Sequence, residues 1–579
     1  EPFRLWWRAQ SAKTPAIMAE VASEVAAEQG DAAFGFALLA SVLMFLALLY
    51  LVHWPDQDIR RYTWGILSMT ISIFCAVLTY SLSNLVVKRV VLEPVLHSGG
   101  LPAVLIYKLA FSCCWHLAFI GALRAVLVVA RRSQDGCTGR DAFRRTRNLM
   151  EATLLLADTT AFASISFWAE LQHILLLQLH GVSRAFGLGV LFGAMLASLL
   201  LMASIDALGA ILGYFCIHPA GGKQDRFERL RQEVAHDGEN DAVGLVGAFL
   251  LAQSTRYAIG GVLPNAEGEE PWWEEHQHSA HDVLLLYLAA VAFNVIGWLY
   301  HIIGRPFRKA PEPSPHDAPL LQKSVSNLSA GQMEEADERE EEEMDEGMVA
   351  AQHDLCGAAS LFCSRVKSIF EVFLDQSSSW AFYYATRWLV AGYIASPSCP
   401  WSPNVDGPYP HEAGHDMAQD LKTFRALLLA VLVSMFSFCL IWGLDKIADA
   451  YESAAKVIRK RIGFMAFLIG FSWEKCFDLA VEAVGEQSPN PILTQSLLGF
   501  SCVLVIIPVW VWYILPMRLE YGYRFGFVPR LVVDRVRGMM EQGNWGARRR
   551  REFKESIGAL LAVLEEEEAA DLVELSRRH

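Results

Sequence analysis

The feature that most constrains this chain is a series of apolar blocks, each about as long as a bilayer is thick. A helix rises about 1.5 Å per residue, so roughly 20 apolar residues cross the ~30 Å hydrocarbon core of a membrane. The block 34–54 reaches this length without a single charged residue. The whole chain is 53% hydrophobic and only 19% charged, which argues against a soluble protein.

The blocks are continuous and rich in Leu and Ala rather than alternating, which favours membrane helices over membrane strands. We therefore expect an all-α integral membrane protein with about eleven transmembrane helices. The expected helices cover residues 34–54, 62–87, 101–130, 152–177, 185–217, 242–263, 283–303, 378–395, 423–444, 462–484 and 492–517.

Positive charge predicts the orientation of these helices, because Lys and Arg accumulate in cytoplasmic loops. With the N-terminus outside, most Lys and Arg between the helices fall on the inner side, including an Arg-rich stretch at 131–151. We expect a cytosolic C-terminus; the sequence does not indicate which cellular membrane is occupied. The first 30 residues show no cleavable signal peptide, and Met18 is a plausible start of the natural chain.

Five segments follow from this pattern. The tract 333–346 is dominated by acids and supplies much of the net charge of −14; its neighbourhood cannot bury a core, so we expect a solvated, disordered tether. The segments are an outer N-terminal segment 1–33, a first membrane region of seven helices at 34–303, a cytosolic acidic linker 304–377, a second membrane region of four helices at 378–517, and a cytosolic tail 518–579 with an amphipathic helix.

Similar short sequences on the two sides of the linker predict an internal duplication of helical units. Thr255-Arg256-Tyr257 followed by Gly261 recurs as Thr386-Arg387-Trp388 followed by Gly392, with the same spacing. Repeats of this kind build many transporters around a central site.

Charged side chains inside apolar helices are costly, so they usually face a partner or a watery path. Glu474, Asp478 and Glu482 are four residues apart and share one face of their helix. An acidic stripe suits a path for cations or protons. The predicted path residues are Glu170, Glu474, Asp478, Asp158 and Asp206, with Arg256 and Arg387 as counter-charges.

A structural interpretation of the same charges competes with the transport interpretation. In it, Arg256 and Arg387 neutralise Glu170 and Glu474 as pairs that only hold helices together.

The transport interpretation has further support in a loop. The loop 264–282, expected outside, contains acids but no Lys or Arg, which would concentrate cations near a pore.

A separate motif, His411-Glu412-Ala413-Gly414-His415, matches the HExxH pattern of zinc peptidases. On a helix, His411 and His415 would share a zinc ion while Glu412 activates its water. Gly414 weakens such a helix, and no third ligand is evident in the sequence.

The sequence thus favours a cation- or proton-linked transporter or channel, more plausibly not an enzyme. The alternatives are a membrane metallopeptidase with zinc at His411, Glu412 and His415, and a non-catalytic membrane scaffold. The expected partners are the lipid bilayer and cations or protons; a homo-oligomer is left open. Nothing supports nucleic-acid binding, and no phosphate-binding loop for ATP occurs in the sequence.

Overall fold

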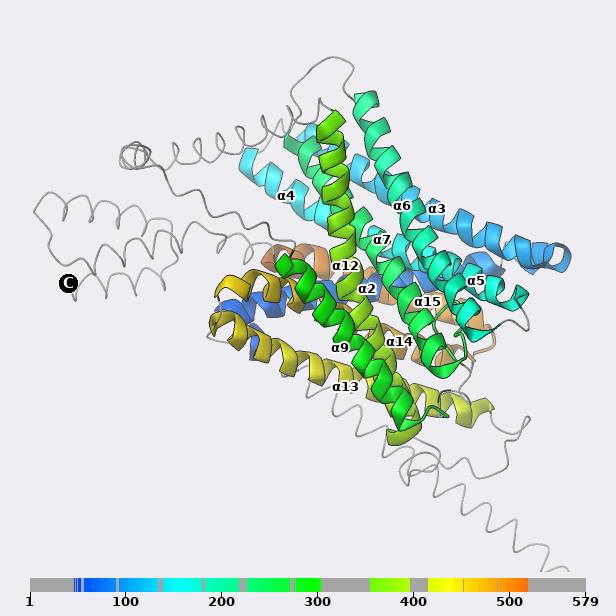
Figure 1. Ribbon diagram of the computed structural model, residues 1–579. Coiled ribbons are helices and arrows are strands. Elements are labelled where there is room, and N and C mark those ends of the chain that lie inside the picture. Colours follow the sequence, from blue (N-terminus) through cyan, green and yellow to red (C-terminus); the bar gives the residue numbers. More distant parts are fainter. Residues whose placement is uncertain are drawn as a thin grey trace, which may run out of the picture. The chain divides into compact units, whose positions relative to one another are not determined.

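The structure is a computed structural model (Figure 1). It describes residues 57–89, 93–133, 139–179, 183–217, 226–303 except 271–274 and 276, 355–395, 415–450, 452–486 and 488–518, with parts of 46–53. Contacts divide the chain into two units, Glu1–Gly304 with Ser364–Leu519 and Arg305–Cys363 with Glu520–His579. Of the second unit only residues 355–363 are described, so the account below concerns the first unit.

The elements of the described residues are helices, with no strand among them, which confirms the all-α class for this part of the chain. They are α2 (Gln57–Val87), α3 (Glu93–Ser133), α4 (Gly139–Ala152), α5 (Leu154–Gln178), α6 (Arg184–Ile217), α7 (Arg226–Gly260), α9 (Ala280–Ile303), α12 (Leu355–Leu389), α13 (His415–Ala450), α14 (Glu452–Glu486) and α15 (Pro491–Val509), with π-helices η2 (Val390–Ile394) and η3 (Trp510–Ile514).

Among the described residues, eight helical stretches are long and apolar enough to cross a membrane. They are Tyr62–Val87, Ala103–Arg132, Arg145–Gln178, Arg184–Asp206, Phe227–Gly260, Ala280–Tyr300, Lys422–Leu444 and Pro491–Arg518, and they coincide with eight of the eleven expected spans. Two further expected spans, 378–395 and 462–484, fall on the less apolar α12 with η2 and on α14. The first, 34–54, lies mostly outside the described residues.

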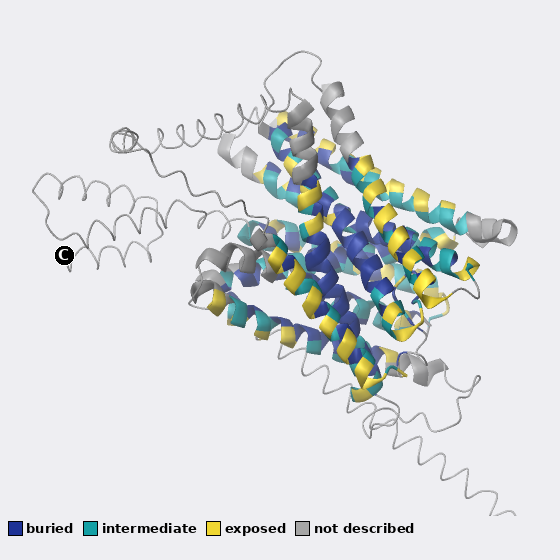
Figure 2. Ribbon diagram, in the orientation of Figure 1, coloured by how far each residue is buried: buried dark blue, intermediate teal, exposed yellow. Residues whose placement is uncertain are grey.

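The helices sort into central and peripheral ones (Figure 2). In the most apolar 18-residue window of each stretch, 78% of the residues are buried for α7 and 72% for the stretch that contains α5. The corresponding share is 11% for α15 and 17% for α6. The charged α12 and α14 are also central, since long runs of both are buried. Apolar helices therefore surround the polar ones, as expected where the surroundings are not water.

Close packing brings α14 against α2. A Cβ atom at Gly470 of α14 would lie 2.8 Å from the Thr70 carbonyl oxygen of α2, so the two backbones approach closely only because this residue is glycine. The contact places the charged residues that follow Gly470 beside the C-terminal half of α2.

The π-helix η2 ends α12 and leaves carbonyl groups that need donors. Arg425 of α13, which is buried, supplies them: its Nε and Nη2 donate to the Ala395 carbonyl oxygen at 3.1 and 2.9 Å. The buried Arg425 therefore satisfies a carbonyl group at the end of this helix.

Candidate functional site

The segment 261–279, between α7 and α9, folds back against the helices. Gly261, with φ of 84°, ends α7, and its N–H donates to the Tyr257 carbonyl oxygen at 2.9 Å. Arg184 of α6 donates to the carbonyl oxygens of Tyr257 and Ala258 at 3.0 and 2.8 Å. The exposed carbonyl groups at this helix end are therefore satisfied, and the chain can turn back immediately.

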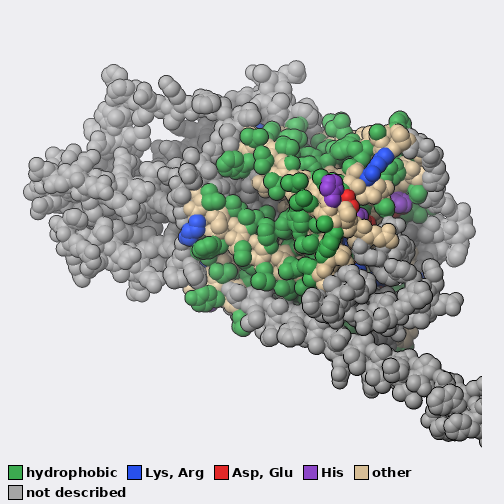
Figure 3. All heavy atoms as spheres, turned by 60° about the horizontal axis from the view of Figure 1, so that its bottom comes forward, with side chains coloured by type: hydrophobic (Ala, Val, Ile, Leu, Met, Phe, Trp, Pro, Cys, Tyr) green, Lys and Arg blue, Asp and Glu red, His purple; other side chains and the backbone are tan. Residues whose placement is uncertain are grey.

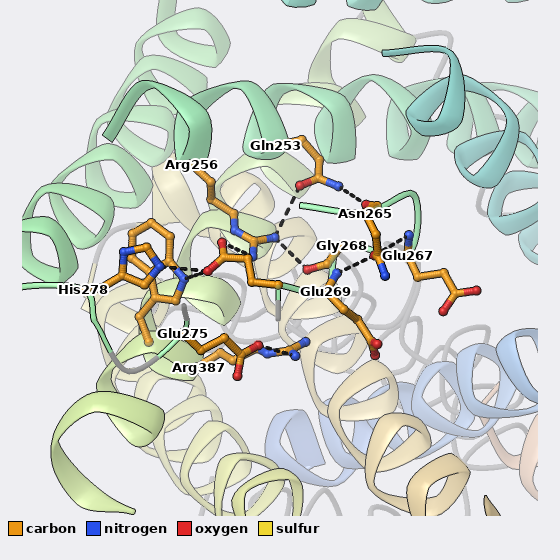
Figure 4. A network of polar contacts seen from close by, with 11 residues as sticks. Gln253, Arg256, Asn265, Glu267, Gly268, Glu269, Glu275, His278 and Arg387 are labelled. Atoms are coloured by element: carbon orange, nitrogen blue, oxygen red, sulfur yellow. Dashed lines mark hydrogen bonds and ion pairs between the residues drawn. The ribbon is translucent and has the colours of Figure 1, made fainter. Parts of the chain in front are cut away.

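A buried ion pair between Arg256 of α7 and Glu270 is the first anchor of this segment (Figure 4). Arg256 Nη2 lies 2.5 Å from Glu270 Oε1, and each side chain is 1% exposed. Arg256 Nη1 donates to the Gly268 carbonyl oxygen at 2.8 Å, while the guanidinium lies 3.8 Å from the centre of the Tyr384 ring. The arginine thus holds both the side chain and the backbone of the segment.

The other oxygen of Glu270 is also satisfied. Trp388 Nε1 of α12 donates to Oε2 at 3.1 Å, and His278 Nε2 lies 2.8 Å from the same oxygen. The imidazole of His278 stacks on the Trp388 ring at 3.7 Å. Burial alone would raise the pKa of Glu270, but the charge of Arg256 and the contact with His278 outweigh it and lower the pKa to about 2.

A second ion pair, between Arg387 of α12 and Glu275, anchors the segment further along. Ahead of the first anchor, the Asn265 side-chain oxygen accepts the N–H groups of Glu267 and Glu269 at 3.0 and 2.8 Å. In Figure 4 the carboxylates of Glu267 and Glu269 point away from Arg256. The segment thus uses Glu270 and Glu275 as anchors and presents the other two acids elsewhere.

Glu267 and Glu269 face a cavity of about 350 Å³ lined by residues of α2, α5, α7, α12, α14 and α15. Two acids of α14, Asp478 and Glu482, line it as well. Its basic residues are Lys88, directly after α2, and Lys475 of α14. Four acids and two lysines make a cavity with a surplus of negative charge.

The charged residues that line the cavity differ in how far they are exposed to solvent. Glu267, Glu482 and Lys88 are exposed, whereas Glu269, Lys475 and Asp478 are partly buried. Lys475 interacts electrostatically with Glu269, Asp478 and the neighbouring Glu474. Burial would raise the pKa of Glu269, but Lys475, Arg387 and other cations lower it, so Glu269 is held ionised.

Glu474 is fully buried, and neither of its carboxylate oxygens has a hydrogen-bond partner among the described residues. It interacts electrostatically with Lys475 and with the cavity acids Asp478, Glu269 and Glu267. A buried carboxylate without hydrogen bonds is costly, so Glu474 lowers the stability of the folded protein.

The sequence-predicted path residues do not form one site. Asp478 lines the cavity, and Glu474 lies on the same helix one turn before it. Glu170 instead pairs with Lys108 of α3 at 2.8 Å, away from the cavity lining. Asp158 accepts a hydrogen bond from Ser72 at 3.2 Å, between α5 and α2.

Asp206 belongs to a different cluster. Arg365 of α12 pairs with it at 3.8 Å and also with Glu239 of α7. His116 of α3 lies close to the same two acids. One potential ligand atom from each of His116, Asp206 and Glu239 lies within 4.8 Å of the other two. Arg365 already supplies a positive charge to both acids, so the geometry is that of a buried ion-pair cluster.

The counter-charges have partners other than those of the structural interpretation. That interpretation paired Arg256 and Arg387 with Glu170 and Glu474, whereas the structure pairs the two arginines with Glu270 and Glu275. The difference arises because segment 261–279 folds inward, bringing acids of a loop to arginines of helices.

The HExxH motif lies at the edge of the described chain. His411 and Glu412 lie outside the described residues, and His415 is the first residue of α13, with its side chain not described. Zinc binding there stays a prediction.

Sequence reasoning missed Glu267 and Glu269 as members of the site, because acids in a loop are usually solvated. A signal was present: Arg256, on a helix with no basic or acidic neighbour within one turn, needed an acid from outside its own helix. The acid-rich, base-free loop that follows it directly was the nearest source.

Comparisons with known protein families, with characterised proteins and with solved structures found no match for this chain.

Proposed function

We propose that this protein is a multi-pass membrane transporter or channel for cations, linked to or carrying protons. The observation that supports this most is the cavity in which Glu267, Glu269 and Asp478 gather around Lys475, within a bundle of apolar helices. Carboxylates replace part of a cation's hydration shell, and charges inside membrane helices are retained mainly for paths of this kind.

In this proposal the chain crosses the bilayer about eleven times, with the N-terminus outside and the C-terminus in the cytosol. Eight apolar helices support multiple crossings, and the distribution of Lys and Arg supports the orientation. The polar α12 and α14 cross at the centre, where the apolar helices separate them from lipid.

Lys475 acts as a tethered cation in the proposed mechanism. It balances the surrounding acids when the cavity is empty and is displaced by an arriving cation, which competes for Glu269 and Asp478. Glu474, fully buried beside it, is the group that takes up a proton when the ammonium group of Lys475 turns away. Exchange of one positive charge for another leaves the net charge of the cavity unchanged.

Ion flux into proteoliposomes tests the proposal, with a panel of protons, sodium, potassium, calcium and zinc. The paired variant Glu269→Gln/Asp478→Asn keeps the side-chain shapes and removes two charges; we expect it to reduce flux at least tenfold. Glu170→Gln is the matched control, since Glu170 pairs with Lys108 outside the cavity lining, and it should leave most of the flux.

A non-catalytic scaffold is the second candidate, supported by the buried pairs of Arg256, Arg387 and Arg365. It predicts no flux of any cation from protein that is folded. It also predicts that Glu269→Gln/Asp478→Asn changes only stability. That pair of results would refute the transport proposal.

A further inference from the structure

The acidic cavity also has an aromatic wall. Its lining includes Phe162 of α5, Phe249 of α7, Trp380 of α12 and Phe471 of α14. These rings contact one another: the Trp380 centroid lies 4.6 Å from Phe471 and 5.0 Å from Phe249. Phe162 and Phe471 are stacked at 6.2 Å. Four helices thus each contribute one ring to a continuous aromatic wall of the same cavity that Glu267 and Glu269 of segment 261–279 line.

An ammonium group already lies against this wall. Lys475 Nζ is 5.9 Å from the centre of the Phe471 ring, within the range at which a cation is attracted to a ring face. The same amine interacts with Glu269 and Asp478. The side chain of Lys475 therefore places an organic ammonium group between aromatic rings and carboxylates in this cavity.

The wall discriminates between classes of cation. Small inorganic cations require oxygen ligands or water on most sides, and aromatic rings cannot provide them. An organic ammonium is less strongly hydrated and gains from ring faces on one side and carboxylates on the other. A cavity of about 350 Å³ lies at the lower end of the range for small-molecule sites, more than a bare ion needs.

We propose that the cavity binds a small organic ammonium ion, with Phe471 and Trp380 receiving its alkyl groups and Asp478 and Glu269 its charge. This inference rests on the proposed function, since it names the class of cation that the path selects. The ligand displaces Lys475 from the Phe471 ring.

Binding to the full-length purified protein tests this directly, without any transport. The probes are tetramethylammonium and choline, with the neutral analogue of choline, in which carbon replaces nitrogen, and sodium chloride as comparisons. Each is titrated while the unfolding midpoint is followed, because a ligand of the folded state raises the midpoint with concentration. We expect saturable shifts with both ammonium probes and none with the neutral analogue or sodium.

Matched variants locate the site. Phe471→Leu should weaken binding of tetramethylammonium about tenfold through loss of a ring face. Phe477→Leu is the control on the same helix, since Phe477 contacts Phe74 at 5.4 Å and does not line the cavity. Asp478→Asn, which leaves the aromatic wall intact, should weaken binding by a similar factor and provides a second variant if Phe471→Leu does not fold.

Equal binding of the neutral analogue, or equal weakening by Phe477→Leu, would overturn the inference. Flux of an inorganic cation that Glu269→Gln/Asp478→Asn abolishes, with no binding of either ammonium probe, would overturn it while leaving the transport proposal in place. Binding that follows the expected variant pattern, with no flux of any inorganic cation and none of tetramethylammonium or choline, would support the site and refute transport.

Discussion

At the residue scale, the arrangement depends on a few fully buried charges with defined partners. Arg256 has four classes of contact: the carboxylate of Glu270, the backbone of Gly268, the side-chain amide of Gln253 and the ring of Tyr384. Removing one partner of a buried pair is far more costly than the net value of the pair, because the other charge stays buried and unpaired.

Glu270→Gln should therefore destabilise the folded protein by about 3 to 5 kcal/mol, since it leaves the Arg256 guanidinium without a counter-charge. Thermal or denaturant unfolding in detergent measures the change. Glu267→Gln is the control: Glu267 is exposed at the cavity, and its substitution should cost less than about 1 kcal/mol. Equal costs for the two variants would contradict the assignment of Glu270 as an anchor.

The same carboxylate gives a pH dependence with a definite sign. The pKa of Glu270 is lowered from 4.5 to about 2 in the folded protein, so folding favours the ionised form. Its contribution, on the order of 3 kcal/mol, is complete above pH about 4.5 and is lost as the pH falls toward 2. Unfolding measured from pH about 6 down to about 3 should show a decline in wild type that Glu270→Gln largely lacks. A parallel decline in both proteins would assign it to other groups.

At the element scale, segment 261–279 is a loop that behaves as part of the core. Its first anchor is in α7 and its second in α12, and α9 begins directly after it with a reciprocal cap between Ser279 and Asp282. Because α7 holds the start of the segment and the Arg256–Glu270 pair fixes it directly after Glu269, Glu267 and Glu269 have a defined direction toward the cavity.

Gly268 is the position where this segment tolerates least change. Its φ is 80°, and a Cβ atom there would overlap the hydroxyl of Tyr384, the residue whose ring carries Arg256. Gly268→Ala should cost at least about 2 kcal/mol through backbone strain and overlap, and it should reduce transport by displacing Glu267 and Glu269. Unfolding and flux on the same preparation measure both effects.

Gly189→Ala is the control for that substitution. Gly189 lies within α6, with nothing within 4 Å of an added Cβ, so alanine should be neutral or slightly stabilising there. A neutral outcome at Gly268 as well would show that the segment is not held as described.

At the scale of the whole first unit, many large apolar side chains are exposed, while the interior holds buried charged residues beside its hydrophobic core. Large apolar side chains of α3, α6, α9, α15 and η3 are exposed, among them Leu504 of α15 at 72% and Trp512 of η3 at 78%. Figure 3 shows one face on which hydrophobic side chains predominate and charged ones are few. Monomeric soluble proteins rarely expose patches of this extent, so the exterior fits a lipid environment.

Leu504→Arg tests that environment. If α15 faces hydrocarbon, the charge should cost about 2.5 to 3.5 kcal/mol, whereas an exposed position in water would change stability by less than about 0.5 kcal/mol. Unfolding in lipid nanodiscs measures the difference, with Leu504→Met as the size-matched apolar control. A near-neutral arginine would place this face of α15 in water.

The apolar helices were predictable from the sequence alone, because the length and hydropathy of a block are local properties. The eight apolar stretches accordingly agree with the expected positions. Asp478 was also predictable as a cavity residue candidate, since a charge four residues from Glu474 on an apolar helix shares its face. The duplication, the orientation and the zinc motif stay predictions.

Only the tertiary structure decided which charges meet. Glu170 and Glu474 each follow an Ala-Phe pair and a tryptophan, Trp168 and Trp473. Nevertheless, Glu170 pairs with Lys108, whereas Glu474 is buried beside a cavity. Glu267, Glu269 and Glu270 are within four residues of one another, yet one anchors the loop and two line the cavity. Pairing of charges depends on distances between segments remote in sequence, and these distances exist only once the helices have packed.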